Sequence, residues 1–592
     1  MRILIFLFLG VFASLGVSSC STPPGDQRVS EEENAEARLK DLYEKAWSWG
    51  QREDGKRLSA AGTWEPDDHW PQVDEDAQLR RLRYWENALA ELAQIPSSDL
   101  DREEQINAAV FEQVASSRAS DLRYKTYQAP LNSDTFFWIG LHPRNTGFTD
   151  LGAYERYLGR VADVPRYLLE HQANMRAGME RGYTVPQVAL AGRENSIEAY
   201  LVDGQKNPFW APFEHFPQTI AQAEQERLRA KMRELISSSI VPAYGQLLSF
   251  LRTEYIPVAR TSIAAKALPN GEAFYREQIR TFTTLDLSPE EIYQTGLSEV
   301  ARIRKAQEAI LEELNFSGTM ADFFAFLRSD PRFYASTPEE LMGVSAYVAK
   351  RMDGKLSEVL GFLPRRRFAI NPVPAEIAPT YTSGRGGLNA CLMNTYNLSA
   401  RPLYAIPALT LHECAPGHAL QAAIALEAPG QIPEFRANNY FSGYGEGWGL
   451  YTEWLGGEIG IYRTPYERFG QLTFEMWRAC RLVIDTGLHQ FDWTRQQAID
   501  YLSEHAALSA HDIETEIDRY ISWPGQALSY KLGEMLIREK RASAETRLGA
   551  DFDQRYFHDV ILSLRSVPLS VLAEELESWI KAGGPNPYEQ TP

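Results

Sequence analysis

The chain has 592 residues and a formal net charge of −19, with 44% hydrophobic, 23% charged and 11% aromatic residues. This composition is typical of a folded globular protein and excludes disordered, collagen-like and polytopic membrane classes. An acidic surface repels phosphate backbones, so we expect no nucleic-acid partner. Four cysteines in this length exclude a disulfide scaffold.

The N-terminal sequence predicts the cellular location of the protein. An apolar run from Ile3 to Val17 follows one arginine and ends in small residues before Cys20. The run is too short for a mature transmembrane helix. It predicts a signal peptide over residues 1–19, and its end resembles the lipobox of bacterial lipoproteins. An ordinary cleaved signal with an accidental cysteine is the alternative.

We therefore expect the mature chain to begin at Cys20 and to carry acyl chains, palmitate among them, that anchor it in the bacterial cell envelope. Ser21, in place of an aspartate, favours the outer membrane facing the periplasm. Residues 20–34 are rich in serine, proline and acidic residues and predict a tether.

Helical periodicity dominates the remaining chain. We expect helices over residues 79–95, 221–240, 468–488 and 526–542. Another helix should begin at Ser288, with Pro289 in its first turn and Glu291 completing a capping box. No internal repeat or interior linker interrupts the pattern. We therefore predict one mainly α-helical domain over 35–592, with a helical N-terminal half (35–340) and a catalytic half (341–592).

One segment departs from the helical pattern. Strand-like runs at 375–382 and 388–396 flank the glycine-rich residues 383–387 and predict a small antiparallel β-hairpin. Pro379 restricts the first strand to a sheet edge. Of Cys391, Cys414 and Cys480 at least one must be unpaired, so we expect that disulfides do not hold the fold.

A candidate metal motif follows this hairpin. Zinc peptidases carry H-E-x-x-H, which places both histidines on one helical face. Here His412 and Glu413 are followed by His418 six residues after the first histidine, roughly 120° off that face in a straight helix. Pro416 and Gly417 lie between them and predict a break that returns His418 to His412.

A third ligand is expected from the glycine-rich run Tyr444–Trp454. Glu446 and Glu453 are seven residues apart and share one helical face. We assign Glu446 as the ligand and Glu453 as a carboxylate that orients a histidine. Satisfied polar groups in a helical core are the alternative interpretation.

These motifs, together with residues 481–489, 519–533 and 556–559, resemble the bacterial family known as domain of unknown function 885 (DUF885). The arrangement is similar to helical zincin peptidases of the converting-enzyme and oligopeptidase type. The resemblance implies a large helical ellipsoid with a central channel and one Zn²⁺ on its floor. It also implies that Tyr520 is the oxyanion donor, with Tyr530 in reserve.

Several other polar residues have alternative interpretations. Arg519 or Lys531 could bind a substrate carboxylate, although ion pairing is the default for each. His489, His511 and His558 are expected to be structural.

The sequence thus predicts a lipid-anchored zinc peptidase for short peptides, in which His412, His418 and Glu446 hold the metal and Glu413 is the general base. An amidase acting on cell-wall peptides and a metal-free peptide-binding lipoprotein are the two alternatives.

Overall fold

A computed structural model describes residues 24–143, 148–375 and 377–588, with side chains from residue 35 onward, that of residue 380 excepted. The predicted signal peptide and Cys20 lie outside these residues. The first helix, α1 (Pro24–Glu53), includes part of the segment that the sequence predicts as a tether.

The described residues are mainly α-helical, as expected. After α1 the α-helices are α2 (Glu75–Leu92), α3 (Arg102–Tyr124), α4 (Leu151–Arg181), α5 (Gln187–Leu190), α6 (Gln222–Leu235), α7 (Val241–Phe250), α8 (Ile256–Val258), α9 (Gly271–Thr283), α10 (Pro289–Glu313), α11 (Met320–Ser329), α12 (Pro338–Asp353), α13 (Leu356–Val359), α14 (Ile406–Glu413), α15 (His418–Glu427), α16 (Glu434–Ala437), α17 (Ser442–Glu458), α18 (Pro465–His489), α19 (Arg495–His505), α20 (Ala510–Ser522), α21 (Ser529–Leu548), α22 (Gln554–Ser563) and α23 (Leu569–Lys581). The strands are β1 (Lys56–Leu58), β2 (Trp64–Pro66), β3 (Ala369–Pro372), β4 (Gly384–Arg385) and β5 (Ala390–Met393).

Local sequence signals explain several helix ends. The capping box at the start of α10 is confirmed: Ser288 and Glu291 each accept a hydrogen bond from the other's backbone N–H. The predicted helices 79–95 and 468–488 correspond to α2 and α18. Prediction 221–240 covers α6 and a short π-helical segment that leads into α7. Amphipathic periodicity therefore located these elements to within a few residues at most ends.

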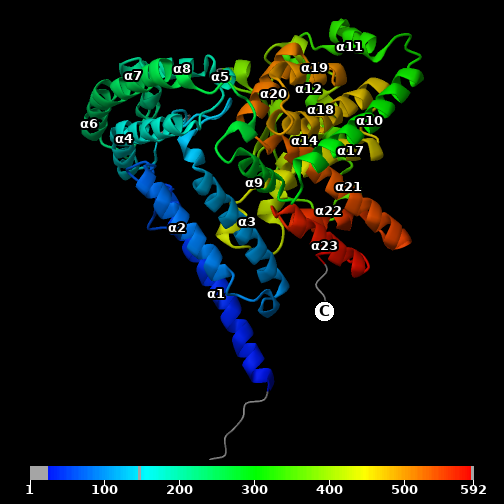
Figure 1. The fold of residues 1–592 in the computed structure, drawn as a ribbon, viewed down its shortest axis with the longest axis horizontal. Coiled ribbons are helices and arrows are strands. Elements are labelled where there is room, and N and C mark those ends of the chain that lie inside the picture. Colours follow the sequence, from blue (N-terminus) through cyan, green and yellow to red (C-terminus); the bar gives the residue numbers. More distant parts are fainter. Residues whose placement is uncertain (1–23, 144–147, 376, 589–592) are drawn as a thin grey trace, which may run out of the picture.

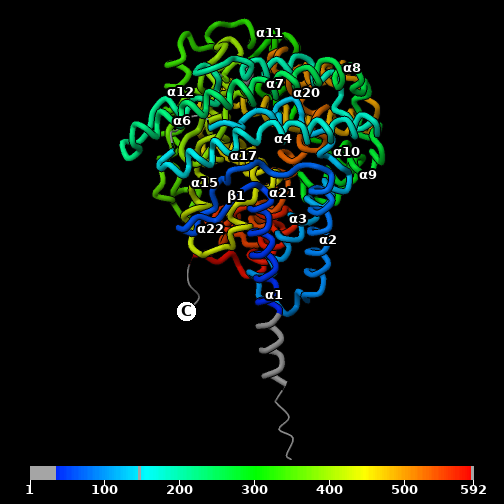
Figure 2. The backbone as a smooth tube through the Cα atoms, turned by 90° about the vertical axis from the view of Figure 1, so that its left-hand side faces the viewer, coloured from blue at the N-terminus to red at the C-terminus, as the bar shows by residue number. Residues whose placement is uncertain are grey.

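The helices gather in three groups (Figure 1). Helices α4–α8 form one group with its own hydrophobic core. Helices α1, α2 and α3 pack along one side of the body, as the rotated view also shows (Figure 2). The third group contains α10–α23, and within it α14 packs against α12, α17 and α18, while α9 packs against α3, α17 and α21. The metal motif therefore lies among the buried helices of the third group.

Two small sheets accompany the helices. Strands β1 and β2 pair antiparallel, with Leu58 opposite Trp64. In the other sheet the order is β3-β5-β4, with β3 parallel and β4 antiparallel to the central β5. The predicted hairpin is thus only partly correct. Its first strand is two residues long, and residues 378–380 form a 3₁₀ turn, in which Pro379 supplies no ladder N–H.

One expectation about the cysteines is wrong. Cys391 of β5 and Cys414 form a disulfide, whereas Cys480 is free and buried. An unpaired cysteine was predicted, but the bond beside the metal motif was not. Its presence is typical of extracytoplasmic proteins.

None of the helices in the described ranges is long and apolar enough to cross a membrane. The central channel that the resemblance implies stays a prediction.

Candidate metal centre

The helix that begins the metal motif is broken where the sequence predicts. Helix α14 ends at Glu413, and α15 begins at His418 after a cis Ala415–Pro416 bond. Across the break the Gly417 N–H donates to the Leu411 carbonyl at 3.0 Å. The Trp448 indole N–H donates to the Pro416 carbonyl at 2.9 Å. The connection between α14 and α15 is therefore hydrogen-bonded both to α14, through Leu411, and to α17, through Trp448.

This break brings the two histidines together. The ring centroids of His412 and His418 lie 4.8 Å apart, with the rings nearly perpendicular. Glu446 of α17 completes the group: its Oε2 lies 3.3 Å from His418 Nε2 and 3.5 Å from His412 Nε2. Ligands of a tetrahedral zinc ion, each about 2.0–2.1 Å from it, are separated by about 3.3 Å. Both distances from Glu446 therefore match the spacing of a zinc site, and all three donor atoms lie within 4.8 Å of one another.

A buried carboxylate fixes the orientation of His412. Its Nδ1 lies 2.8 Å from Oε1 of Glu453, whose side chain is fully buried. With Nδ1–H donating to Glu453, the lone pair on Nε2 faces His418 and Glu446. Gly449 makes room for this ring, because a Cβ there would lie 2.7 Å from His412 Cε1. Imidazole, imidazole and carboxylate, with the first imidazole oriented in this way, form a donor set suited to a divalent metal.

Charge at the site also favours a cation. Burial alone lowers the pKa of His412, but hydrogen bonds to Glu446 and Glu453 raise it to about 10. Burial raises the pKa of Glu446, yet the nearby His418 and His412 hold it well below its usual range. The carboxylates therefore stabilise positive charge at the histidines, whether protons or a metal supply it.

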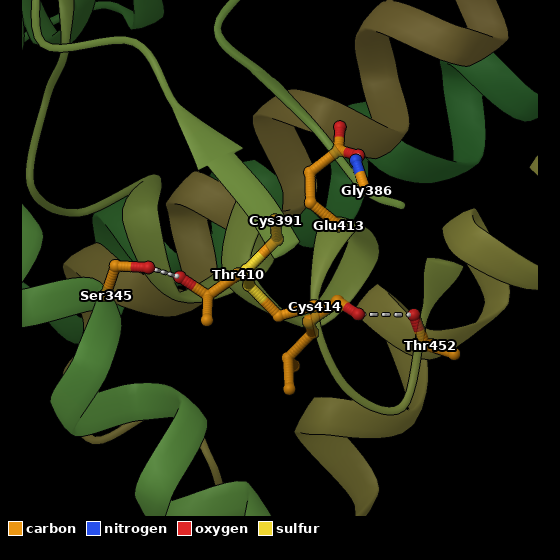
Figure 3. The surroundings of a disulfide bond; sticks show 8 residues. Ser345, Gly386, Cys391, Thr410, Glu413, Cys414 and Thr452 are labelled. Atoms are coloured by element: carbon orange, nitrogen blue, oxygen red, sulfur yellow. Dashed lines mark hydrogen bonds between the residues drawn. A yellow bond between two sulfur atoms is a disulfide. The ribbon is translucent and has the colours of Figure 1, made fainter. Parts of the chain in front are cut away.

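Glu413, the predicted general base, is held by the small sheet (Figure 3). The backbone N–H of Gly386, just after β4, donates to Glu413 Oε2. The disulfide joins the next residue, Cys414, to Cys391 in β5. The Glu413 charge raises the pKa of both His412 and His418, so its carboxylate acts electrostatically on the same site.

Tyr440 is a site residue that the sequence analysis missed. It exposes 57% of its surface. Desolvation by the surrounding protein, followed by the negative charge of Glu446, raises the pKa of its phenol well above the usual range. A Cβ on Gly445 would lie 2.3 Å from the Tyr440 hydroxyl, so this glycine admits the tyrosine. Tyr440 precedes α17 by two residues and belongs to no spacing pattern, so only the fold reveals it.

The two tyrosines predicted from the resemblance lie in another cluster. The Tyr520 hydroxyl accepts hydrogen bonds from Trp477 Nε1 and Arg481 Nε, each at 2.9 Å, and the residue is 1% exposed. Arg481 lies over the ring of Tyr530, 4.3 Å from its centroid. The role of either tyrosine in catalysis stays a prediction.

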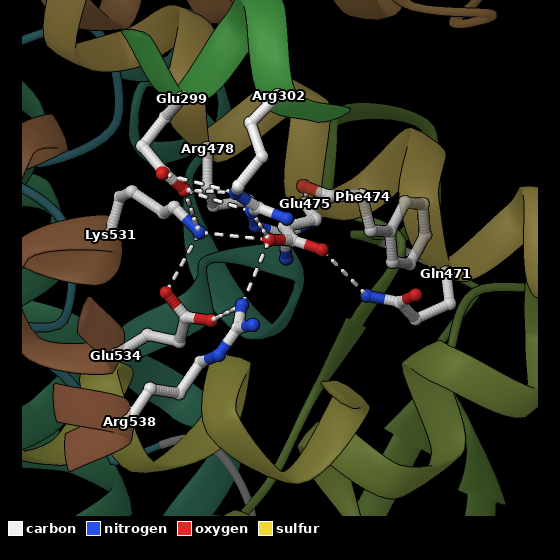
Figure 4. Close-up of polar contacts among 9 residues, drawn as sticks. All are labelled: Glu299, Arg302, Gln471, Phe474, Glu475, Arg478, Lys531, Glu534 and Arg538. Atoms are coloured by element: carbon white, nitrogen blue, oxygen red, sulfur yellow. Dashed lines mark hydrogen bonds and ion pairs between the residues drawn. The ribbon is translucent and has the colours of Figure 1, made fainter. Parts of the chain in front are cut away.

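The remaining candidates have structural contacts. Lys531 is fully buried among Glu299, Glu475 and Glu534, in an ion-pair network that Arg302 and Arg538 extend (Figure 4).

Of the three histidines considered outside the metal motif, two have structural hydrogen bonds. His489 accepts from the Ala265 N–H and pairs with the Tyr520 carbonyl, and His558 pairs with Tyr451 and the Val359 carbonyl. Burial lowers the pKa of both to about 3, so each is neutral. His511 is exposed near the start of α20.

Comparison with known proteins gives a family but no activity. Residues 56–576 match the family described as "Bacterial protein of unknown function (DUF885)". No curated protein matches significantly.

Two of the solved structures with this fold come from Colwellia psychrerythraea and Shewanella oneidensis. A protein of Colwellia psychrerythraea, provisionally described as a lipoprotein, is 24% identical with a TM-score of 0.83 and covers 93% of this chain and 99% of its own. A provisionally described lipoprotein of unknown function from Shewanella oneidensis is 18% identical with a TM-score of 0.65, and covers 91% of this chain and 98% of its own.

Proposed function

The chain belongs to the DUF885 family of bacterial proteins of unknown function, and we propose that it is a zinc-dependent peptidase, lipid-anchored in the cell envelope, that cleaves short peptides. The observation that supports this proposal best is the convergence of His412, His418 and Glu446, whose donor atoms all lie within 4.8 Å of one another. Glu453 behind one histidine and Glu413 beside the pair add the groups that a hydrolytic metal site uses.

Zinc is the metal that this donor set favours, because two imidazoles and one carboxylate leave a fourth position for water in catalytic zinc sites. When bound, zinc lowers the pKa of water and polarises a carbonyl. The proposed kinship to helical zincins rests on this ligand set and on the mainly helical fold.

The other groups have separable roles. Glu413 takes a proton from the attacking water and returns it to the leaving amine. The Gly386 N–H keeps the Glu413 carboxylate in place. Tyr440 donates a hydrogen bond from its hydroxyl to the developing oxyanion, a role for which it is better placed than Tyr520, which is 1% exposed in the core. Glu453 holds His412 and touches no substrate.

An amidase for cell-wall peptides would use the same residues, and the expected location in the envelope motivates that alternative. A metal-free peptide-binding lipoprotein would need neither the spacing of the three donor atoms nor Glu413.

Metal analysis of the purified protein, followed by peptide assays, tests the proposal. We expect about one equivalent of zinc per chain, loss of peptide hydrolysis after chelation, and recovery on adding zinc back. Preferred cleavage of cell-wall peptides over linear peptides would support the amidase. Failure to bind zinc or any other divalent metal would leave the peptide-binding alternative.

A further inference from the structure

Glu453, the carboxylate behind His412, has a second partner. Its Oε1 lies 2.8 Å from His412 Nδ1 and 3.7 Å from Nη2 of Arg478 on α18. Its Oε2 is buried and has no hydrogen-bond partner among the described residues. The side chains of Glu453 and Arg478 are 0% and 6% exposed. One oxygen of Glu453 therefore faces both the predicted metal ligand and a buried guanidinium group.

The guanidinium group of Arg478 is held in place by its own helix. Its Nη1 donates to the Phe474 carbonyl, one turn earlier, at 3.4 Å, and its central carbon lies 4.4 Å from the centroid of the Trp477 ring. The neighbouring network around Lys531 pairs with other arginines (Figure 4). Within the part of the chain that the structure describes, Glu453 is the one carboxylate that forms an ion pair with Arg478.

Glu453 needs a partner of this kind. A fully buried carboxylate is costly unless it is paired and hydrogen-bonded. His412 cannot supply the charge when it binds a metal, because a ligating imidazole is neutral and offers only its N–H. Arg478 supplies a permanent charge, since a guanidinium group does not lose its proton in proteins. It therefore stabilises the Glu453 carboxylate where that group accepts from the Nδ1–H of His412.

We propose that Arg478 is a positioning residue of the metal centre, which acts through Glu453 to keep Nε2 of His412 facing His418 and Glu446. Helix α18 carries none of the three predicted ligands, so Arg478 is its contribution to the metal centre. The inference rests on the proposed zinc site but not on the cleavage of peptides.

The zinc affinity of the full-length, metal-stripped protein, measured by competition with a chromogenic chelator, tests the proposal. We expect Arg478→Gln to bind zinc about 10- to 100-fold more weakly than the wild type, the usual loss for a group behind a metal ligand. Glu453→Gln should lose at least as much, because it removes the group that contacts His412. The double variant should bind zinc like Glu453→Gln alone, because Arg478 acts only through Glu453.

Arg481 provides a matched control. It lies three residues later on α18, is 2% exposed and pairs with Glu516 at 3.0 Å. Arg481→Gln therefore also removes a buried ion pair, but it should bind zinc like the wild type. With cobalt in place of zinc, the visible absorption spectrum reports the geometry of the bound ion. We expect this spectrum to change in Arg478→Gln and to stay unchanged in Arg481→Gln.

Equal zinc affinity in the wild type and Arg478→Gln would overturn the proposal. So would losses that add in the double variant, because Arg478 would then affect the metal by a route other than Glu453. An equal loss in Arg481→Gln would show a general effect of buried charge and would also overturn it. If Arg478→Gln does not fold by circular dichroism, Arg478→Lys keeps the charge without the planar guanidinium group and provides the same comparison, with a smaller expected loss.

The two proposals fail in different ways. If Arg478→Gln weakens zinc binding through Glu453 but the zinc-loaded wild type hydrolyses no peptide, the peptidase proposal is wrong and the positioning role stands. If the wild type hydrolyses peptides and Arg478→Gln binds zinc as tightly, the positioning role is wrong and the peptidase stands.

Discussion

Glu413 and Glu446 are both carboxylates beside the histidines, but they contact different groups. Glu446 approaches both imidazole Nε2 atoms, whereas Glu413 Oε2 is held by the Gly386 N–H. A ligand and a base should therefore fail differently when removed. At this scale the site can be dissected by single substitutions.

We expect Glu446→Ala to lose the metal and Glu413→Gln to keep it while losing hydrolysis by a factor of about 100 to 10,000. Zinc content and peptidase rate, measured on the same preparations, check both. Glu458→Ala, an exposed position on the same helix as Glu446, should change neither quantity. Full zinc content in Glu446→Ala would make Glu453 the better ligand candidate, and an active Glu413→Gln would contradict the mechanism.

Tyr440→Phe removes a hydroxyl that faces Glu446. We expect kcat to fall about 100-fold or more, the usual loss for one oxyanion donor, with KM and zinc content nearly unchanged. Tyr520→Phe removes a buried hydroxyl that Trp477 and Arg481 use, so it should lower the unfolding temperature more than kcat. The opposite pattern would restore Tyr520 as the donor.

Asp485, buried on α18, makes stability depend on pH. Burial raises its pKa from 3.8 to about 7, although hydrogen bonds from Tyr275 and the Gly525 N–H oppose this. Between about pH 4 and 7 the folded chain holds a proton that the unfolded chain releases, so stability falls as pH rises through this window and levels off above it.

Asp485→Asn cannot ionise and should lack this part of the decline. The unfolding free energy of the variant minus that of the wild type should increase by on the order of 2 kcal/mol from pH 5 to pH 8, measured by denaturant titration. Any stability that the variant loses by burying the asparagine amide is the same at both pH values, so it cancels in this comparison. Asp500→Asn, at an exposed position, should follow the wild type at both pH values. A parallel shift of Asp485→Asn at both values would show that Asp485 is ionised in the folded chain.

At the scale of elements, α17 approaches α14 closely only because of its glycines. A Cβ at Gly449 would lie 2.7 Å from the His412 ring. Near the end of α17, a Cβ at Gly457 would meet Tyr462 at an ordinary 4.0 Å. The two positions therefore form a matched pair.

We expect Gly449→Ala to displace His412 and to weaken zinc binding about 10- to 100-fold, as changes next to a ligand do. Gly457→Ala should bind zinc normally and gain up to about 1 kcal/mol from helix propensity. Competition with a chromogenic chelator measures both affinities. Equal affinities in the two variants would show that the His412 ring has room to move.

Sequence reasoning succeeded for elements with strong local signals. Periodicity located α2 and α18, the capping box located the start of α10, and Pro416 with Gly417 located the break between α14 and α15. It failed for strands of two to four residues, which are too short to show a period and pair through distant segments. Sequence reasoning also missed Tyr440 and the pairing of Cys391 with Cys414. Both depend on which residues lie close together in the fold, and no residue spacing in the sequence indicates this.

At the scale of the whole molecule, the predicted anchor lies outside the described residues and remains to be tested. We expect Cys20→Ser to leave the protein unprocessed or soluble, because acylation requires the thiol. Membrane fractionation with palmitate labelling checks this. Ser19→Ala, which keeps the cysteine and a small residue before it, should remain anchored. A Cys20→Ser variant that is processed and membrane-bound like the wild type would disprove the lipoprotein prediction.

The Cys391–Cys414 bond has a consequence for when the protein becomes competent. It joins β5, the central strand of the small sheet, to the residue after Glu413 at the end of α14. The sheet region that contains Gly386, which donates to Glu413, is thereby linked covalently to the helix that carries His412. Such bonds rarely persist in a reducing cytosol. A newly synthesised chain would thus carry all the ligands before the bond between β5 and the end of α14 has formed. If the protein is the proposed peptidase, we expect it to become fully active only after export to an oxidising compartment. The reduced cytoplasmic chain would then be inactive toward the cell's own peptides, as a peptidase with its propeptide is.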